Sequence, residues 1–122
     1  MPSDQKLEKL ILLLIRETTE GRIKWQAAFS PKTRVIGTDD IIADYFVAEF
    51  KEQGIAVFDR RSRGYDPDHD SLYWQSDPGF ALLNEGDITW ETEHPKPQLW
   101  NLLKVARESA ADVDNIVDSL LN

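Results

Sequence analysis

The sequence predicts an α+β domain: an N-terminal helix, an antiparallel meander of five or six strands, and a long C-terminal helix packed on one face of the sheet. Apolar residues recur at helical spacing near both ends of the chain. Between them, short segments rich in aromatic and β-branched residues alternate with turns rich in Gly, Pro and Asp. The 122 residues suffice for one domain, 1–122, with one hydrophobic core.

The first helix is expected over residues 3–20. Ser3 can cap it, Asp4 suits the positive end of its dipole, and Gly21 follows as a stop. One apolar stripe is formed by Leu7, Leu10, Ile11 and Leu14. The stripe is widened by Leu12, Leu13 and Ile15. The helix is therefore expected to make contacts on more than one side.

The next segment, residues 22–29, alternates Ile23 and Trp25 with polar residues, which predicts a strand. A loop is expected over residues 30–40, punctuated by Pro31 and Gly37.

Residues 39–53 fit two structures. A helix would gather Ile42, Tyr45, Phe46, Glu49 and Phe50 on one side. A strand would alternate Phe46, Ala48 and Phe50 with Tyr45, Val47 and Glu49. The aromatic and β-branched content and the short link "KEQG" into "IAVFD" favour a hairpin, so we predict a strand.

Two further strands are expected at residues 71–76 and 79–83, separated by Asp77-Pro78. A tight turn at residues 84–87 leads into a strand at 88–92. The sheet ends at Pro95 and Pro97, and Pro97 suits the first turn of a helix.

The last helix could run for about 25 residues, or nearly 37 Å at the usual helical rise. Because that is long for so small a domain, we expect it either to break near Ala111-Asp112 or to project towards a second copy. Its apolar positions are Leu99, Leu102, Leu103, Ala106, Ala110, Val113, Val117, Leu120 and Leu121. Strand alternation also leaves apolar side chains on both sheet faces, as with Leu72 and Trp74 against Tyr73. Two helices cover only one face, so the other is expected to pair in a dimer.

Both ends of the chain, "TTEGRIKW" and "LWNLLKVARESAADVDNIVDSLL", with "FALLNEGDITW" between them, carry a family pattern. In this pattern a helix leads into a Gly-x-Ile-x-Trp strand and an Ala-rich acidic helix closes the chain. It resembles a family of short uncharacterised bacterial proteins, many of them cyanobacterial, which implies the fold but no activity. The residues that carry it are Thr18, Gly21, Ile23, Trp25, Gly86, Ala106, Ala110, Val113 and Asp114. Residues 30–44 depart from this pattern.

Charge is divided unevenly along the chain. Residues 1–61 hold ten basic and ten acidic residues, whereas residues 62–122 hold four and twelve, which accounts for the net charge of −8. An acidic chain repels phosphate backbones and anionic lipid, so the sequence disfavours nucleic-acid and membrane-surface roles. The acidic half is expected either to serve solubility or to attract a basic partner.

The chain has no cysteine, which excludes disulfides, thiolate zinc sites and cysteine nucleophiles. The apolar run at residues 10–15 is too short for a signal peptide or for a spanning helix of roughly 20 residues. We therefore expect a cytoplasmic protein.

The stretch "YDPDHDSLYWQSD" raises the possibility of a metal site. Asp66, Asp68 and Asp70 alternate as in a calcium-binding loop, and Asp77 falls on its twelfth position. However, Ser71 stands where that loop needs Gly, and the flanking segments are strand-like. A polar hairpin turn, its carboxylates compensated by Arg60, Arg61 and Arg63, is the preferred interpretation.

Catalytic alternatives are weaker. A zinc site would need His69 and His94 to converge with carboxylates. Ser71 lies near His69 and Asp70, but strand neighbours point to opposite sides and cannot form a triad. Glu91 and Glu93 could share a strand face for acid–base work, although solvated strand-end charges are commoner. We predict no catalytic, cofactor-binding or metal-binding residues.

The four tryptophans either fill the core and the helix–sheet seam or anchor a binding surface; they are Trp25, Trp74, Trp90 and Trp100. Together these patterns predict a non-enzymatic protein–protein interaction domain that forms a homodimer and has no cofactor. The alternative is a small metal-binding protein or metal-dependent hydrolase using Asp66, Asp68, Asp70 and His69.

Overall fold

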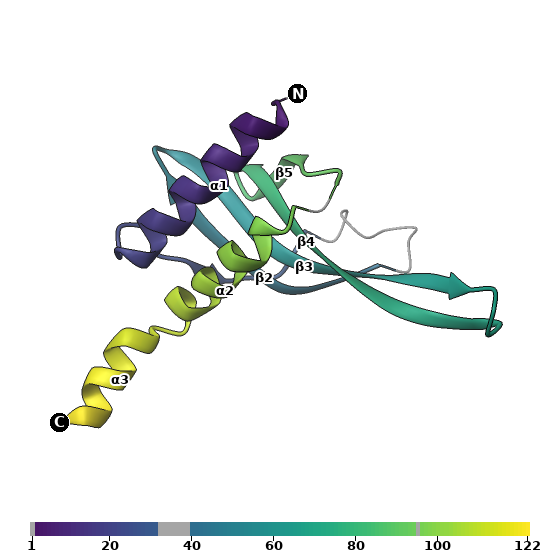
Figure 1. Ribbon diagram of the computed structural model, residues 1–122. Helices are drawn as coiled ribbons and strands as arrows, with labels where there is room; N and C mark the ends of the chain where they lie inside the picture. Colours follow the sequence, from purple (N-terminus) through teal and green to yellow (C-terminus); the bar gives the residue numbers. More distant parts are fainter. Residues whose placement is uncertain (1, 32–39, 95) are drawn as a thin grey trace.

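A computed structural model describes residues 2–31, 40–94 and 96–122 and has the expected α+β architecture (Figure 1). Five antiparallel strands form one open sheet in the order β1-β2-β3-β4-β5, and two helices lie on one of its faces. The elements are α1 (Asp4–Thr19), β1 (Gln26–Ala27), β2 (Ile41–Phe50), β3 (Gln53–Asp66), β4 (Ser71–Asn84), β5 (Asp87–Glu91), α2 (Gln98–Ala110) and α3 (Val113–Leu121).

The first helix begins and ends as its sequence predicts. The hydroxyl oxygen of Ser3 accepts a hydrogen bond from the Lys6 backbone N–H at 3.2 Å, which caps α1. Gly21 follows the helix with a φ of +80°, a conformation that favours glycine. The buried part of its apolar stripe is Leu7, Ile11 and Leu14.

The prediction of a strand over residues 22–29 is wrong for most of that segment, because β1 spans only Gln26–Ala27. The backbone N–H groups of Arg22 and Ile23 both bond to the carbonyl of Glu17, so they cap the end of α1 instead of joining the sheet. The Trp25 N–H bonds to the Ser109 hydroxyl on α2. Ile23 and Trp25 are nevertheless buried. Most of the loop predicted over residues 30–40, including Gly37, lies outside the described residues.

The ambiguous segment forms a strand, as predicted. β2 spans residues 41–50 and pairs with β3 through a two-residue turn at Lys51 and Glu52. Both turn residues have positive φ, 51° and 66°, which matches the right-handed twist of the hairpin strands. The turn predicted at residues 84–87 also forms, with positive φ at Glu85 and Gly86.

The two strands predicted at residues 71–76 and 79–83 are one continuous strand, β4, that passes through Asp77 and Pro78. The Phe80 carbonyl accepts a hydrogen bond from the Thr92 backbone N–H, and the Phe80 N–H donates to the Thr92 hydroxyl. Both backbone groups of Phe80 therefore point away from β3. Backbone groups alternate in direction along an antiparallel strand, so the nitrogen of Pro78 also points away from β3. β5 pairs with β4 only from Ala81 onwards. A proline at this edge therefore costs no ladder hydrogen bond.

The C-terminal helix breaks where the sequence suggested. α2 ends at Ala110, and Asp112 adopts a left-handed conformation with φ of +55° before α3 begins. The buried side of α2 consists of Leu99, Leu102, Leu103 and Ala106. The predicted packing of the C-terminal helix on the sheet is thus made by α2, whereas α3 buries no residue. Figure 1 shows α3 projecting away from the sheet.

The main core lies between the two helices and the sheet, and a second apolar cluster covers the opposite sheet face. That second cluster consists of Tyr45, Ala56, Phe58, Ala81 and Leu83. The rings of Tyr45 and Phe58 stack with centroids 5.8 Å apart, and no member of the cluster is more than 8% exposed. The opposite face is apolar, as expected, but its side chains are already buried within one chain. Among the described helices, none is long and apolar enough to cross a membrane.

Candidate functional site

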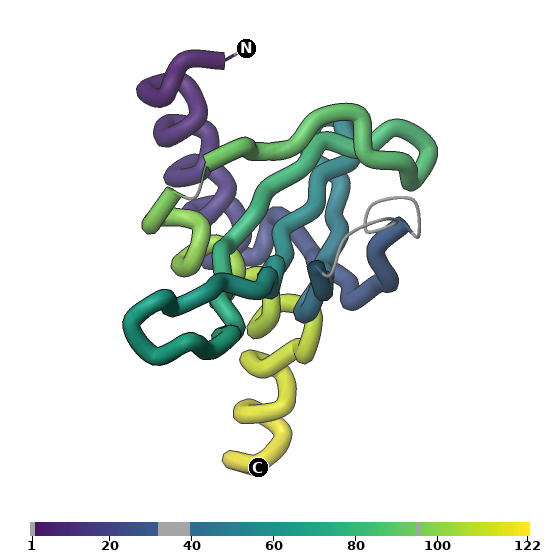
Figure 2. The backbone as a smooth tube through the Cα atoms, turned by 90° about the vertical axis from the view of Figure 1, so that its right-hand side faces the viewer, coloured from purple at the N-terminus to yellow at the C-terminus, as the bar shows by residue number. Residues whose placement is uncertain are grey.

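The β3–β4 hairpin extends well beyond its neighbouring strands. β2 pairs with β3 as far as Arg61, and the β4–β5 pairing starts at Ala81, so residues 62–75 pair only with each other in the described sheet. We call this two-stranded extension, residues 62–75, the hairpin arm. Figures 1 and 2 show it projecting from the body of the molecule.

One face of the hairpin arm is apolar and exposed. Tyr65 lies opposite Leu72, and Arg63 lies opposite Trp74, in two neighbouring cross-strand pairs on the same face. The exposed fractions of Tyr65, Leu72 and Trp74 are 55%, 63% and 50%. The Arg63 guanidinium lies 5.0 Å from the centre of the Trp74 ring, a cation–π contact that orients the indole. Contiguous exposed apolar side chains of this kind mark contact surfaces.

The tip of the hairpin arm holds the residues considered for a metal site. Asp66 accepts hydrogen bonds from the Asp68 backbone N–H at 3.0 Å and from the His69 ring at 2.7 Å. The Tyr65 hydroxyl donates to Asp70 at 2.6 Å, and this bond raises the pKa of Tyr65 above its ordinary value. The carboxylates thus serve the turn, as the hairpin interpretation expects.

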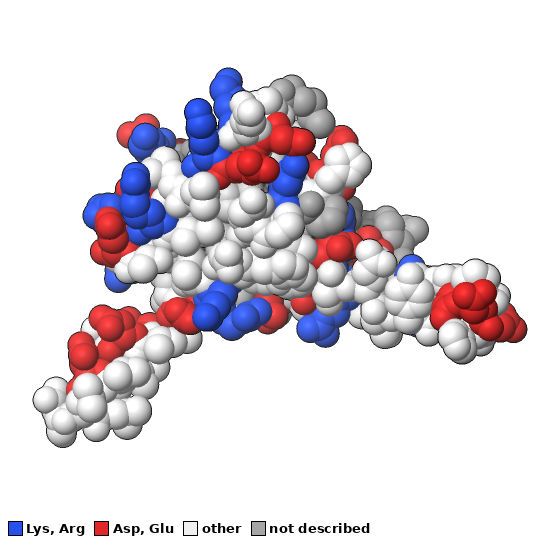
Figure 3. All heavy atoms as spheres, in the orientation of Figure 1, with Lys and Arg blue, Asp and Glu red and all other residues white. Residues whose placement is uncertain are grey.

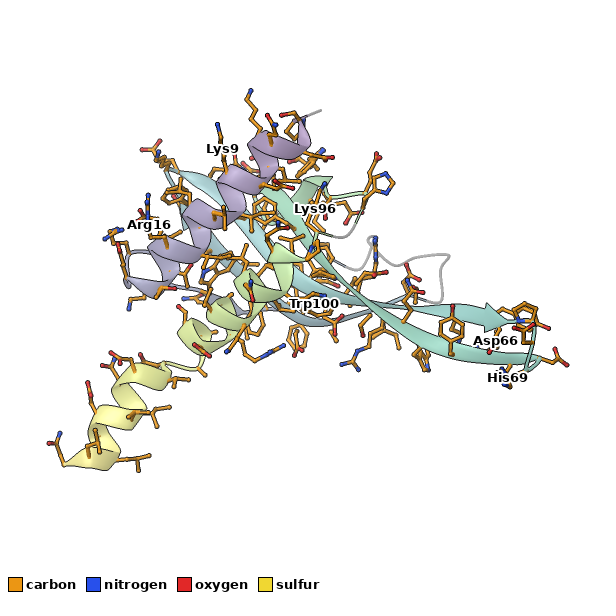
Figure 4. The ribbon with its side chains drawn as sticks, viewed as in Figure 1. Lys9, Arg16, Asp66, His69, Lys96 and Trp100 are labelled. Carbon is orange, nitrogen blue, oxygen red and sulfur yellow. The ribbon has the colours of Figure 1, made fainter. Side chains whose placement is uncertain are left out.

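The structure does not bring the two histidines together. His69 lies at the tip of the hairpin arm beside Asp66 (Figure 4), whereas His94 belongs to the segment before α2. An ion pair of 2.7 Å between Lys96 and Asp4 holds that segment against the start of α1, and it lowers the pKa of Asp4. Within residues 2–31, 40–94 and 96–122, no three His, Asp or Glu side chains are grouped as metal ligands.

Addition of Ca²⁺, Mn²⁺ or Zn²⁺ is therefore expected to leave the melting temperature unchanged, because the tip carboxylates already accept hydrogen bonds from their own turn. A metal bound at 100 times its dissociation constant would add about 2.7 kcal/mol to the free energy of unfolding. Thermal unfolding with each metal and with a chelator measures this difference. A rise of several degrees that the substitution Asp66→Asn removes would establish the metal site instead.

The other catalytic candidates are also dispersed. Ser71 is exposed at the start of β4, and the His69 ring bonds to Asp66 instead of Ser71. β5 ends at Glu91, so Glu93 lies beyond the strand in an exposed bend and does not share a strand face with Glu91. These positions form no arrangement of nucleophile, base and orienting group.

The tryptophans divide between the core and the surface. Trp25 is 2% exposed, and its indole N–H donates to the Thr18 hydroxyl at 2.9 Å. Trp90 is partly buried against the main core. Trp74 on the hairpin arm and Trp100 on α2 are 50% and 42% exposed. Two of the four are thus available as anchors of a binding surface, where Trp is favoured.

α3 presents a second exposed apolar surface. Five of its nine residues are large and apolar, with exposed fractions from 41% to 80%: Val113, Ile116, Val117, Leu120 and Leu121. Its charged residues, Asp114 and Asp118, are both acidic. Figure 3 shows the acidic side chains gathered on one side of the projecting helix and uncharged side chains on the other. An amphipathic helix with an exposed apolar side is typical of a segment that binds another surface.

A shallow apolar groove of about 490 Å³ lies between the N-terminal half of α1 and the strands β4 and β5. We call it the α1–β5 groove. Phe80 forms its floor, and its remaining lining is Pro2, Lys6, Leu7, Leu10, Leu82 and Trp90. Lys6 is the only charged residue among them.

The α1–β5 groove was not predicted from the sequence, because its walls come from segments about 80 residues apart. The sequence pattern of the hairpin arm was present, but Pro78 suggested that β4 was two separate strands. The alternation on either side of Asp77-Pro78 continues in phase, from Leu72 and Trp74 to Phe80 and Leu82, as one strand requires.

Comparison of the chain with protein-family models, curated proteins and solved structures gives no significant match to any of them.

Proposed function

We propose that this chain is a non-enzymatic protein–protein interaction domain that works as a homodimer. The observation that carries this proposal is the surface area of a single copy. The chain exposes 8323 Å² at a mass of 14.0 kDa. A compact monomer of that mass exposes about 6,700 Å², so this chain has an excess of roughly 1,600 Å².

Two elements that project from the body of the molecule carry exposed apolar side chains. The hairpin arm presents Tyr65, Leu72 and Trp74, and α3 presents the apolar side described above. Burial of apolar surface stabilises an assembly by about 25 cal/mol per Å² before the cost of association is subtracted. Two such surfaces on one small domain support contact with a second copy and with another protein.

The distribution of charge favours a partner protein with a basic face. The acidic residues concentrate in the second half of the chain, and both charged residues of α3 are carboxylates. Electrostatic complementarity would favour a partner with a basic face. We place the protein in the cytoplasm on the strength of its cysteine-free composition, and among bacterial proteins on the strength of the family resemblance.

Unfolding that depends on concentration tests the homodimer. If folding and dimerisation are coupled, the melting temperature measured at 200 µM exceeds that at 2 µM. A hundredfold increase in concentration adds about 2.7 kcal/mol per dimer, which corresponds to roughly 5 °C for a chain of this length. Calorimetry or circular dichroism at both concentrations provides the measurement. Identical melting temperatures would count against a dimer.

A further inference from the structure

We propose that α3 of one copy docks in the α1–β5 groove of a second copy, and that the exchange is reciprocal. This inference rests on the proposed function and names the surface through which the homodimer forms. It follows from four properties of the described residues: an apolar helix side, an apolar groove, their opposite charges, and their positions at different ends of the molecule.

The first property is the apolar side of α3. The positions 113, 116, 117, 120 and 121 follow the spacing of one helix side, and none of these side chains is buried. The helix has nine residues, so it is about 13 Å long at the usual rise. Such a short helix is marginal in water without packing. A binding surface would stabilise it.

The second property is the composition of the groove. Leu10, Leu82 and Trp90 are only partly buried, and they pack against the main core from its solvent side. The groove is thus an opening onto the core itself, over the buried ring of Phe80. A helix placed there would extend the hydrophobic core of the partner, in the manner of helix-in-groove recognition.

The third property is charge. Among the described residues that line the groove, Lys6 is the only charged one, and the charged residues of α3 are Asp114 and Asp118. By helical spacing Asp114 lies at the edge of the apolar side, next to Leu121, whereas Asp118 lies further round the helix. Docking the apolar side of α3 into the groove can therefore bring Asp114 towards Lys6. Direct pairing of α3 with α3 of a second copy would instead bring carboxylates close to carboxylates, which is unfavourable. Charge selects the groove over helix-to-helix pairing.

The fourth property is position. Val113 and Val117 line a depression together with Thr18 and Gly21, so α3 starts beside the C-terminal end of α1. The groove lies at the other end of α1, near Pro2 and Lys6. α1 has 16 residues and a length of about 24 Å, so α3 in this arrangement does not fill the groove of its own chain. A second copy related by a two-fold axis can fill it, and both copies then make the same contact.

The area is sufficient for this dimer. Stable dimers bury about 1,200–2,000 Å² in total, or roughly 600–1,000 Å² from each copy. The excess surface of one chain, roughly 1,600 Å², is larger than that contribution.

The test measures the dimer dissociation constant of full-length variants by sedimentation equilibrium. Leu120→Asp places a carboxylate on the apolar side of α3 and is expected to weaken the dimer at least tenfold. Ser119→Asp adds the same charge at the preceding position, off the apolar side, and is expected to change the dissociation constant less than threefold. Both residues are exposed, so neither substitution disturbs the core, and circular dichroism verifies this.

Charge exchange gives an independent test of the same contact. Lys6→Glu and Asp114→Lys are each expected to weaken self-association severalfold, whereas Lys9→Glu, which lies off the groove on the same helix, is not. A mixture of the Lys6→Glu and Asp114→Lys variants should form heterodimers close to wild-type affinity. In such a heterodimer, each groove again faces an opposite charge.

The possible results are distinct. A wild-type dimer that Leu120→Asp leaves intact, or variants that fail to associate when mixed, would overturn this inference and leave the homodimer standing on another surface. A wild-type chain that stays monomeric would overturn the inference and also the homodimer in the proposed function.

Discussion

Replacing Trp25 with alanine is expected to lower the free energy of unfolding by about 3–5 kcal/mol, whereas replacing Trp74 costs less than about 1 kcal/mol. Trp25 is 2% exposed in the main core, and Trp74 is 50% exposed on the hairpin arm. The first change leaves a cavity and also removes the hydrogen bond from the indole to Thr18, whose hydroxyl donates in turn to the Leu14 carbonyl. The second change removes the contact with Arg63 and shortens a side chain that is already half exposed to solvent.

Urea unfolding monitored by far-ultraviolet circular dichroism measures both variants at one protein concentration. Circular dichroism is chosen because it reports the backbone, whereas tryptophan fluorescence would change with the substitutions themselves. Equal losses from the two substitutions would show that the hairpin arm is part of the folded core and not a surface held out for a partner.

Replacing Gly79 with alanine is expected to destabilise the fold by about 1–3 kcal/mol, whereas the same replacement at Gly64 costs less than about 1 kcal/mol. A Cβ atom at Gly79 would lie 2.4 Å from the ring of Phe58, and one at Gly64 would lie 2.3 Å from the ring of Tyr73. The two contacts are equally tight, but their rings differ in freedom. Phe58 is 1% exposed and stacked on Tyr45, whereas Tyr73 is 47% exposed and can rotate into water.

This pair of alanine variants separates the sheet body from the hairpin arm without touching a charged residue. Chemical denaturation of both, measured beside the wild type, gives the two free-energy differences. A large loss of free energy of unfolding on replacing Gly64 would mean that Tyr73 is held rigidly, contrary to its exposure on the hairpin arm. A negligible loss at Gly79 would mean that the apolar cluster on the second sheet face is loosely packed.

Local signals were sufficient to predict the elements whose ends depend on their own residues. The cap at Ser3, the stop at Gly21 and the turn at Glu85 and Gly86 all form as their residue types indicate. The break of the last helix also forms near the predicted Ala111-Asp112. In each case the backbone conformation is determined by a few neighbouring residues, so a single sequence suffices.

The mistaken predictions concern residues whose partners are distant in the sequence. The segment at residues 22–29 reads as a strand by alternation, yet the backbone of Arg22 and Ile23 bonds to Glu17 at the end of α1. Asp77-Pro78 predicts a boundary between two strands, although the Pro78 nitrogen faces an edge of β4 that has no neighbouring strand in the described sheet. Sequence patterns show which side chains are apolar but not which side of a strand is already paired.

The candidate surfaces were predictable only in part. The length of the last helix suggested a projecting segment, and α3 indeed packs none of its residues in the core. The surplus of apolar side chains was expected on the open sheet face, where Tyr45 and Phe58 are in fact buried. It lies instead on the hairpin arm and α3. The α1–β5 groove depends on packing between α1 and β5, which the sequence does not reveal.

A single copy leaves large apolar side chains exposed on the hairpin arm and on α3, and we propose that a second copy covers part of them. Sedimentation equilibrium of the wild-type chain over micromolar to millimolar concentrations tests it most directly. We expect a mass that rises to about 28 kDa, twice the 14.0 kDa of one chain. A mass that stays at 14.0 kDa up to the highest concentration would contradict it.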